Sequence, residues 1–320
     1  MPTTLRRLLP IVFSLIALAA MAPGAAAATT DLPTQSLGNR GADVRAIQGL
    51  LGARGFPVAI DGLFGPATAS QVSAFQAASG LPANGIVSSA TWSRLFVPLS
   101  PGSTGDAVKV VQLLLNEKRF AHIAVNGTFD AATRNAVVAF QTHLKMTPHG
   151  NVGPVTWTRL IHQYDYPAFT AGIVCDYSAG NGKANWATGA AIGQLEAAAR
   201  PFVATGHGRI PIGDASRELG GDIPGHATHE VGLDVDIRPM RDANDQCKWG
   251  TNWRLSSYDR AATRILINAI RAAAPGHVKL IYFNDPVLIK EGLTTSFIGH
   301  DDHLHVRYCE VSHPEARYRC

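Results

Sequence analysis

Five histidines in two short clusters are the residues of this 320-residue chain with the clearest potential for chemistry. The first cluster, GHATH, occupies residues 225–229, and the second, GHDDHLH, occupies residues 299–305. Eight of the twelve histidines lie within residues 175–320. Histidines gathered in this way beside aspartates are typical of metal sites, because imidazole and carboxylate are both zinc ligands.

Two aspartates follow the first cluster at a spacing that suits a strand. Asp234 and Asp236 come after His229, across a glycine and within a β-branched run. Alternate residues of a strand face the same way, so Asp234 and Asp236 share a face, as do His303 and His305. Two neighbouring strands can therefore present ligands across one cleft. Catalytic zinc takes three protein ligands and one open position, which one Asp and two His satisfy.

The same histidines and aspartates allow other metal motifs and other roles. His226 and His229 are followed by Glu230, but a helical zinc-peptidase motif needs His-Glu-x-x-His or His-x-x-Glu-His, and neither order occurs. A lone buried histidine is more often a hydrogen-bonded core residue than a ligand, and only the joint pattern favours a metal site. Asp234 and Asp302 are rival carboxylates, either partners of an imidazole or bases, and spacing does not rank them.

The order His-x6-Asp followed by His-x-His resembles the ligand signature of metallopeptidases related to lysostaphin and the D-Ala-D-Ala peptidases. More narrowly, residues 200–308 resemble the penicillin-insensitive murein endopeptidases. The resemblance implies zinc as the cofactor and His229, Asp236 and His305 as its ligands. It implies that His303 acts beside the metal as general base or electrostatic partner. It also implies that His226 and His300 line the site. The candidate catalytic residues are therefore His303, His300 and Asp302, with His226 and Asp234 expected to line or support the site.

The function implied is hydrolysis of peptide cross-links in bacterial peptidoglycan, at the bond from D-alanine to a diamino acid. A D-Ala-D-Ala carboxypeptidase is the first alternative, although its usual glutamate and Trp-His arrangement near the last ligand is missing. A wall-binding protein with structural zinc and no activity is the second alternative. The intact ligand set and the additional His303 argue against that second reading.

The elements that must position these residues suggest an α+β catalytic domain over residues 175–320. Apolar residues at helical spacing predict helices near Ala190–Phe202 and Asp259–Ala274, the second stopped by Pro275-Gly276. Val278–Asn284 reads as a buried strand. With the two motif strands, it predicts a small antiparallel sheet flanked by helices.

A sequence repeat precedes that domain. Shifting the chain by 64 or 65 positions brings residues 37–96 into register with residues 102–161, so that Gln48 aligns with Gln112 and Trp92 with Trp157. The shared pattern resembles the peptidoglycan-binding repeat, a three-helix module. The fold class predicted for the whole chain is therefore multidomain, with two all-α repeats before the α+β domain. The partner implied is peptidoglycan.

The first residues predict export. Arg6 and Arg7 precede an apolar run, and small residues follow it at 25–28, so residues 1–28 read as a signal peptide. The protein is then expected in the periplasm or the extracellular cell wall, with no stable membrane insertion after cleavage. Removing the two arginines lowers the formal charge from +4 to +2, which argues against nucleic acid as a partner.

Four cysteines, all within the last 146 residues, predict two disulfides, because exported thiols meet an oxidising environment. None of the four forms a Cys-x-x-Cys pair that would suggest metal binding. Four cysteines allow three connectivities, among which the sequence does not choose.

Overall fold

The structure, a computed structural model, describes residues 32–178 and 184–320. The predicted signal peptide, residues 1–28, lies outside these ranges. In the described part of the chain, no helix is both long and apolar enough to cross a bilayer. Leu32–Cys320 form a single unit, which contains both repeats and the C-terminal region.

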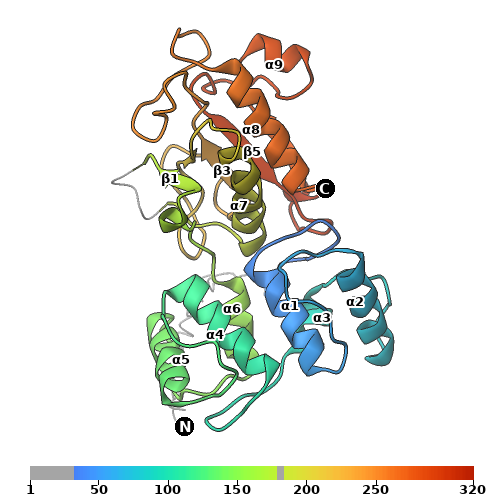
Figure 1. Cartoon of the computed structure of the whole chain (residues 1–320). Coiled ribbons are helices and arrows are strands. Elements are labelled where there is room, and N and C mark those ends of the chain that lie inside the picture. Colours follow the sequence, from blue (N-terminus) through green and yellow to red (C-terminus); the bar gives the residue numbers. More distant parts are fainter. Residues whose placement is uncertain (1–31, 179–183) are drawn as a thin grey trace, which may run out of the picture. The chain divides into compact units, whose positions relative to one another are not determined.

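Each repeat forms three helices, as predicted (Figure 1). The first repeat contains α1 (Ala42–Ala53), α2 (Pro66–Ala78) and α3 (Ser89–Leu95). The second contains α4 (Asp106–Arg119), α5 (Ala131–His143) and α6 (Pro154–His162). The aligned tryptophans Trp92 and Trp157 are both fully buried, in one apolar core that runs from Leu32 to Ile161. The repeated aromatic positions therefore serve packing.

The aligned glutamines explain why the turn before the second helix is preserved in both repeats. Gln48 Nε2 donates to Asp61 Oδ1 at 2.8 Å, and Gln112 Nε2 donates to Asn126 Oδ1 at 3.0 Å. Each glutamine oxygen also accepts the N–H of the glycine that follows, at 2.9 Å in both repeats. An amide oxygen thus replaces the carboxylate oxygen without loss of the turn.

The C-terminal region is built on a five-stranded sheet of order β1-β2-β3-β5-β4. Its strands are β1 (Val174–Asp176), β2 (Ile210–Ile212), β3 (Asp234–Ile237), β4 (Val278–Tyr282) and β5 (Leu304–Tyr308). The predicted fold class is confirmed, with one difference: β1 and β2 are parallel, so the sheet is mixed. The parallel pair arises because the chain between them includes α7 (Gly189–Val203), which serves as the crossover helix.

Helices α7 and α8 (Arg260–Ala273) lie side by side against this sheet (Figure 1). Both match the helices predicted from apolar spacing to within one residue at each end. Thr188 and Asp259 cap them by accepting the N–H groups of Ala191 and Ala262. The strand predicted from Val278 ends at Tyr282, two residues early. It was predicted to be buried, but only Ile281 is, because β4 lies at the edge of the sheet. Shorter elements are α9 (Pro286–Lys290) and 3-10 turns at Phe169–Ala171 and Ala316–Tyr318.

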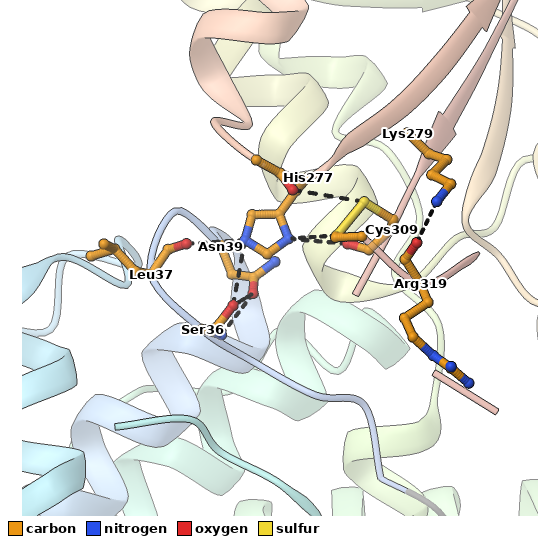
Figure 2. Close-up of a disulfide and its surroundings, with 9 residues drawn as sticks. Ser36, Leu37, Asn39, His277, Lys279, Cys309 and Arg319 are labelled. Carbon is orange, nitrogen blue, oxygen red and sulfur yellow. Dashed lines mark hydrogen bonds between the residues drawn. A yellow bond between two sulfur atoms is a disulfide. The ribbon is translucent and has the colours of Figure 1, made fainter. Parts of the chain in front are cut away.

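The two predicted disulfides are present, as Cys175–Cys247 and Cys309–Cys320. Figure 2 shows the second of them beside His277, which is 2% exposed. The ring nitrogens of His277 lie 3.0 Å from the carbonyl oxygens of Cys309 and Leu37. This histidine therefore ties the segment before α1 to the end of the sheet.

A buried glutamate makes a second contact with that segment and predicts a pH effect on stability. Glu310 is 6% exposed and accepts the Thr34 N–H at 3.0 Å. Burial raises the pKa of Glu310 to about 8, with the Thr34 hydrogen bond opposing and the charge of Asp43 adding to the rise. Between about pH 4.5 and pH 8, the folded protein keeps a proton that the unfolded chain has released. The free energy of unfolding therefore falls as the pH rises through this window.

Glu310→Gln should lose less stability than the wild type between about pH 5 and pH 8, because glutamine carries no titrating proton. The expected difference is a few kcal/mol, at about 1.4 kcal/mol per pKa unit. Urea unfolding at each pH measures it. Glu315→Gln is the control, since that side chain is 42% exposed and should follow the wild type. Identical pH dependence in Glu310→Gln and the wild type would show that this carboxyl does not titrate as described.

Candidate metal centre

Strands β3 and β5 place an aspartate opposite a histidine. Asp236 pairs with His305 in the antiparallel register, and Asp234 lies two residues before Asp236 on the same face. The alternate residue Val235 is fully buried in the apolar core. His229 reaches the same place from the loop that precedes β3 and is 1% exposed. The predicted pairing of the two motif strands is therefore how the clusters meet.

Three polar atoms of these residues converge. His229 Nε2 lies 3.1 Å from His305 Nδ1 and 3.5 Å from Asp236 Oδ1. His305 Nδ1 lies 3.1 Å from Asp236 Oδ1. A tetrahedral zinc ion with bonds of about 2.0–2.1 Å needs ligand atoms about 3.3 Å apart. The three atoms fit one face of such a tetrahedron.

Each of the two imidazoles has its other nitrogen held by an acceptor. His229 Nδ1 lies 2.8 Å from the carbonyl oxygen of Ala215, and His305 Nε2 lies 2.9 Å from Asp234 Oδ1. An acceptor at one ring nitrogen fixes the proton there and leaves the other lone pair free. His229 also has a φ of 80°, in the left-handed region, which costs about 1–3 kcal/mol in a non-glycine residue. The loop thus holds a strained histidine with its lone pair toward Asp236.

Asp234 holds these residues from the sheet side. It is 0% exposed and, besides His305, accepts Arg307 Nε at 2.7 Å, the Tyr318 hydroxyl at 2.9 Å and the His229 N–H at 3.2 Å. Burial acts to raise the pKa of Asp234, but the bonds and charges of His305 and Arg307 outweigh it and lower that pKa. Of the two roles predicted for Asp234, these contacts favour the partner of an imidazole over a base.

The charge of the cleft favours a cation. Burial lowers the pKa of His305, but hydrogen bonds to Asp234 and Asp236 outweigh it and raise that pKa to about 9. Burial likewise works against ionised Asp236, yet hydrogen bonds from His229 and His305 hold the pKa of Asp236 far below its usual range. A cation that binds His305 Nδ1 has to displace a proton, so metal affinity is expected to rise with pH.

His226 offers a second way to complete a group of three ligands. The ligand atoms of His226, His229 and Asp236 all lie within 4.8 Å of one another. His226 Nδ1 is 3.8 Å from Asp236 Oδ2, and its Nε2 is 3.1 Å from Asp214 Oδ2. The 3.8 Å separation of His226 from Asp236 is wider than the 3.1 Å separation of His305 from Asp236. The geometry favours His305 as the third ligand and places His226 at the edge of the cleft, held by Asp214.

The remaining residues of the second cluster lie beside these ligand atoms. His303 Nε2 lies 3.9 Å from Asp236 Oδ1, and its Nδ1 lies 2.9 Å from Asp302 Oδ1. The side chain of Asp302 is 69% exposed. The His300 ring centroid is 4.7 Å from that of His303, while its Nδ1 lies 2.9 Å from a backbone carbonyl oxygen. Asp302 therefore orients His303, and His300 packs against it.

Known protein families match both parts of the chain. Residues 40–95 and 104–160 each match the model of a peptidoglycan binding domain. Residues 180–279 match the penicillin-insensitive murein endopeptidases. Within the C-terminal region, this match spans β2, β3, α7 and α8. Both resemblances predicted from the sequence are thus confirmed as matches to these two families.

The chain is also similar to an uncharacterized protein encoded in the bpoA1 3′ region of Kitasatospora aureofaciens. The two are 42% identical over 66 residues, which is 20% of this chain and 56% of that protein. The chain thus spans little more than half the length of this relative.

The endopeptidase match covers the first cluster and both aspartates of β3, and it ends before the second cluster. Residues 299–305 join the site only through the pairing of β5 with β3. The sequence reasoning assigned no role to Arg307 or Tyr318, which hold Asp234. Arg307 continues the alternate spacing of His303 and His305, a signal that was open to interpretation. Tyr318 comes from a separate turn and carries no such signal.

Proposed function

We propose that the C-terminal region is a zinc endopeptidase whose metal ligands are His229, Asp236 and His305. The observation that carries the proposal is the triangle of ligand atoms with edges of 3.1, 3.1 and 3.5 Å. Zinc bound there would lower the pKa of its water toward about 7 and polarise the scissile carbonyl. Asp234 and the Ala215 carbonyl keep the two ligand lone pairs turned inward.

His303 is the residue that we assign to proton transfer. Asp302 engages Nδ1 of His303, which leaves the Nε2 lone pair on the side of Asp236. From this position Nε2 can accept a proton from the attacking water and deliver it to the leaving amine. We assign His226, which is held by Asp214, and His300, which packs against His303, to the lining of the site.

The bond that we assign is the cross-link from D-alanine of one stem peptide to the diamino acid of the next. The repeats support this assignment, because tethering a catalytic domain to an insoluble polymer raises its effective concentration there. We further infer that the protein works outside the cytoplasm, in the periplasm or the cell wall. The predicted signal peptide and the two disulfides support export.

The test is digestion of cross-linked peptidoglycan by the purified protein, followed by mass analysis of the released muropeptides. The proposal predicts that dimers are converted to monomers, that a chelator stops the reaction, and that added zinc restores it. Loss of terminal D-alanine alone would replace the proposal with a carboxypeptidase. Dimer cleavage that resists the chelator would show that the reaction needs no metal. No cleavage at all would favour a peptidoglycan-binding protein without peptidase activity.

A further inference from the structure

A cavity of about 340 Å³ opens beside His303. Its walls come from the end of β1, the end of β3, and the loop between β3 and α8. The residues that line it are Tyr177, Arg238, Gly250, Thr251, Asn252, Leu255, Asp302 and His303. Because His303 forms part of its wall, a substrate bound for cleavage has to extend into or past this cavity.

Arg238 is the cation of this cavity. It follows Asp236 by two residues and lies one residue past the end of β3. Its guanidinium stacks on the Tyr177 ring, with Cζ 4.2 Å from the ring centroid. The Tyr177 ring packs directly against Gly213, since a Cβ added to that glycine would lie 2.3 Å from the ring. The ring is therefore fixed. The guanidinium is thus held in place by a rigid aromatic surface.

This guanidinium lacks a carboxylate partner among residues 32–178 and 184–320. Its side-chain hydrogen bond is from Nη1 to the carbonyl oxygen of Gln246 at 3.3 Å, and it forms no ion pair with a described carboxylate. A guanidinium has five N–H donors, so most of its capacity is available to a ligand. Asp302 is the one acidic residue among those that line the cavity; its carboxylate is bonded to His303, and its charge also acts on Arg238.

The side-chain amide of Asn252 also favours an anionic ligand in this cavity. Asn252 Oδ1 accepts the Arg254 N–H at 2.9 Å, which leaves the NH2 end of Asn252 to donate to a ligand. The cavity therefore offers a fork of guanidinium donors and an amide donor next to the proposed proton-transfer histidine. A planar carboxylate matches such a fork through two parallel hydrogen bonds.

We propose that Arg238 binds a carboxylate of the substrate on the leaving-group side of the scissile bond. This inference rests on the proposed function. In a cross-link to a diamino acid that has a carboxylate at each end, the carbon bearing the scissile nitrogen also bears a carboxylate. His303 delivers a proton to that nitrogen, so the carboxylate one carbon away belongs in the cavity that His303 and Arg238 share. Arg238 is thereby a specificity-determining residue.

The test is calorimetric binding of the uncross-linked disaccharide tetrapeptide to the full mature protein. Two probes are compared, one with a free carboxylate beside the side-chain amine of the diamino acid and one with that group converted to a carboxamide. The wild type should bind the acid about 10–100-fold more tightly, as expected for a charge-assisted pair. Arg238→Gln should lose this preference and bind the amide as the wild type does. Arg238→Lys should recover part of it.

Arg254→Gln is the matched control. Arg254 also stacks on an aromatic ring, Trp253, with Cζ 4.2 Å from the centroid, but its guanidinium is paired with Asp301. This variant should keep the full preference for the acid. Equal binding of both probes by the wild type, or no measurable binding of either, would overturn the role of Arg238 even if cross-links are cleaved.

Two further outcomes distinguish the carboxylate site at Arg238 from the proposed endopeptidase activity. Preference for the acid that depends on Arg238, without any dimer cleavage, would keep the carboxylate site and remove the endopeptidase. A pentapeptide probe with a free or amidated terminal D-alanine distinguishes the source of the carboxylate. Preference that depends on Arg238 for the free terminus alone would overturn the assignment to the diamino acid.

Discussion

His305→Ala is expected to lose bound zinc and peptidase activity together. The substitution removes one of three ligand atoms and leaves Asp234 and Asp236 without their shared partner. Removing a residue that merely supports a zinc ligand costs about 10–100-fold in metal affinity, and removing a ligand should cost more. Metal content after dialysis, measured by mass spectrometry, and the rate of muropeptide dimer cleavage report the two losses.

His303→Ala is the informative comparison. Its Nε2 lies 3.9 Å from Asp236 and outside the ligand triangle, so zinc should be retained. The cleavage rate should fall by about 10²–10⁴-fold, the usual contribution of a general acid–base residue. Equal loss of zinc in both variants would undo the division between ligand and proton-transfer residue.

Asp234→Asn is expected to damage both stability and metal binding. The carboxylate is fully buried and accepts hydrogen bonds from His305, Arg307 and Tyr318. Asparagine keeps the shape but leaves the Arg307 guanidinium buried without a counter-charge, which costs about 3–5 kcal/mol. It also weakens the hold on the His305 tautomer, with an expected loss of about 10–100-fold in zinc affinity.

Urea unfolding and competition with a calibrated chelator measure these two effects. Asp302→Asn is the control, because Asp302 is also bonded to a histidine but is 69% exposed. It should keep stability and zinc affinity while slowing cleavage, since it orients His303. Wild-type zinc affinity in Asp234→Asn would show that Asp234 does not position a ligand.

The repeats could be predicted closely because their signals are local. Helix positions follow from apolar spacing, and the aligned glutamine, glycine and tryptophan serve the same turn and core in both copies. Helices α7 and α8 of the C-terminal region were predicted to within a residue for the same reason, whereas the short α9 was not predicted. The parallel pairing of β1 and β2 was not, because it depends on where the chain returns after α7.

For the site as well, local spacing predicted some features and missed those that depend on distant parts of the chain. Alternation along a strand predicted which residues share a face, and the pairing of Asp236 with His305 places them opposite each other. Spacing did not separate Asp234 from Asp302, since their difference lies in burial: one is enclosed by Arg307 and Tyr318, and the other faces solvent. Arg238 gave no signal, because its significance depends on Tyr177 and on a cavity formed by distant loops.

The position of the metal decides whether His229, Asp236 and His305 are its ligands. Anomalous diffraction from crystals of the zinc-loaded protein, recorded on both sides of the zinc absorption edge, locates the ion without reference to activity. We expect one peak, about 2.0–2.1 Å from His229 Nε2, His305 Nδ1 and an Asp236 oxygen, with the fourth position open to water. A peak ligated by His226 in place of His305, or one enclosed by four protein ligands, would contradict it.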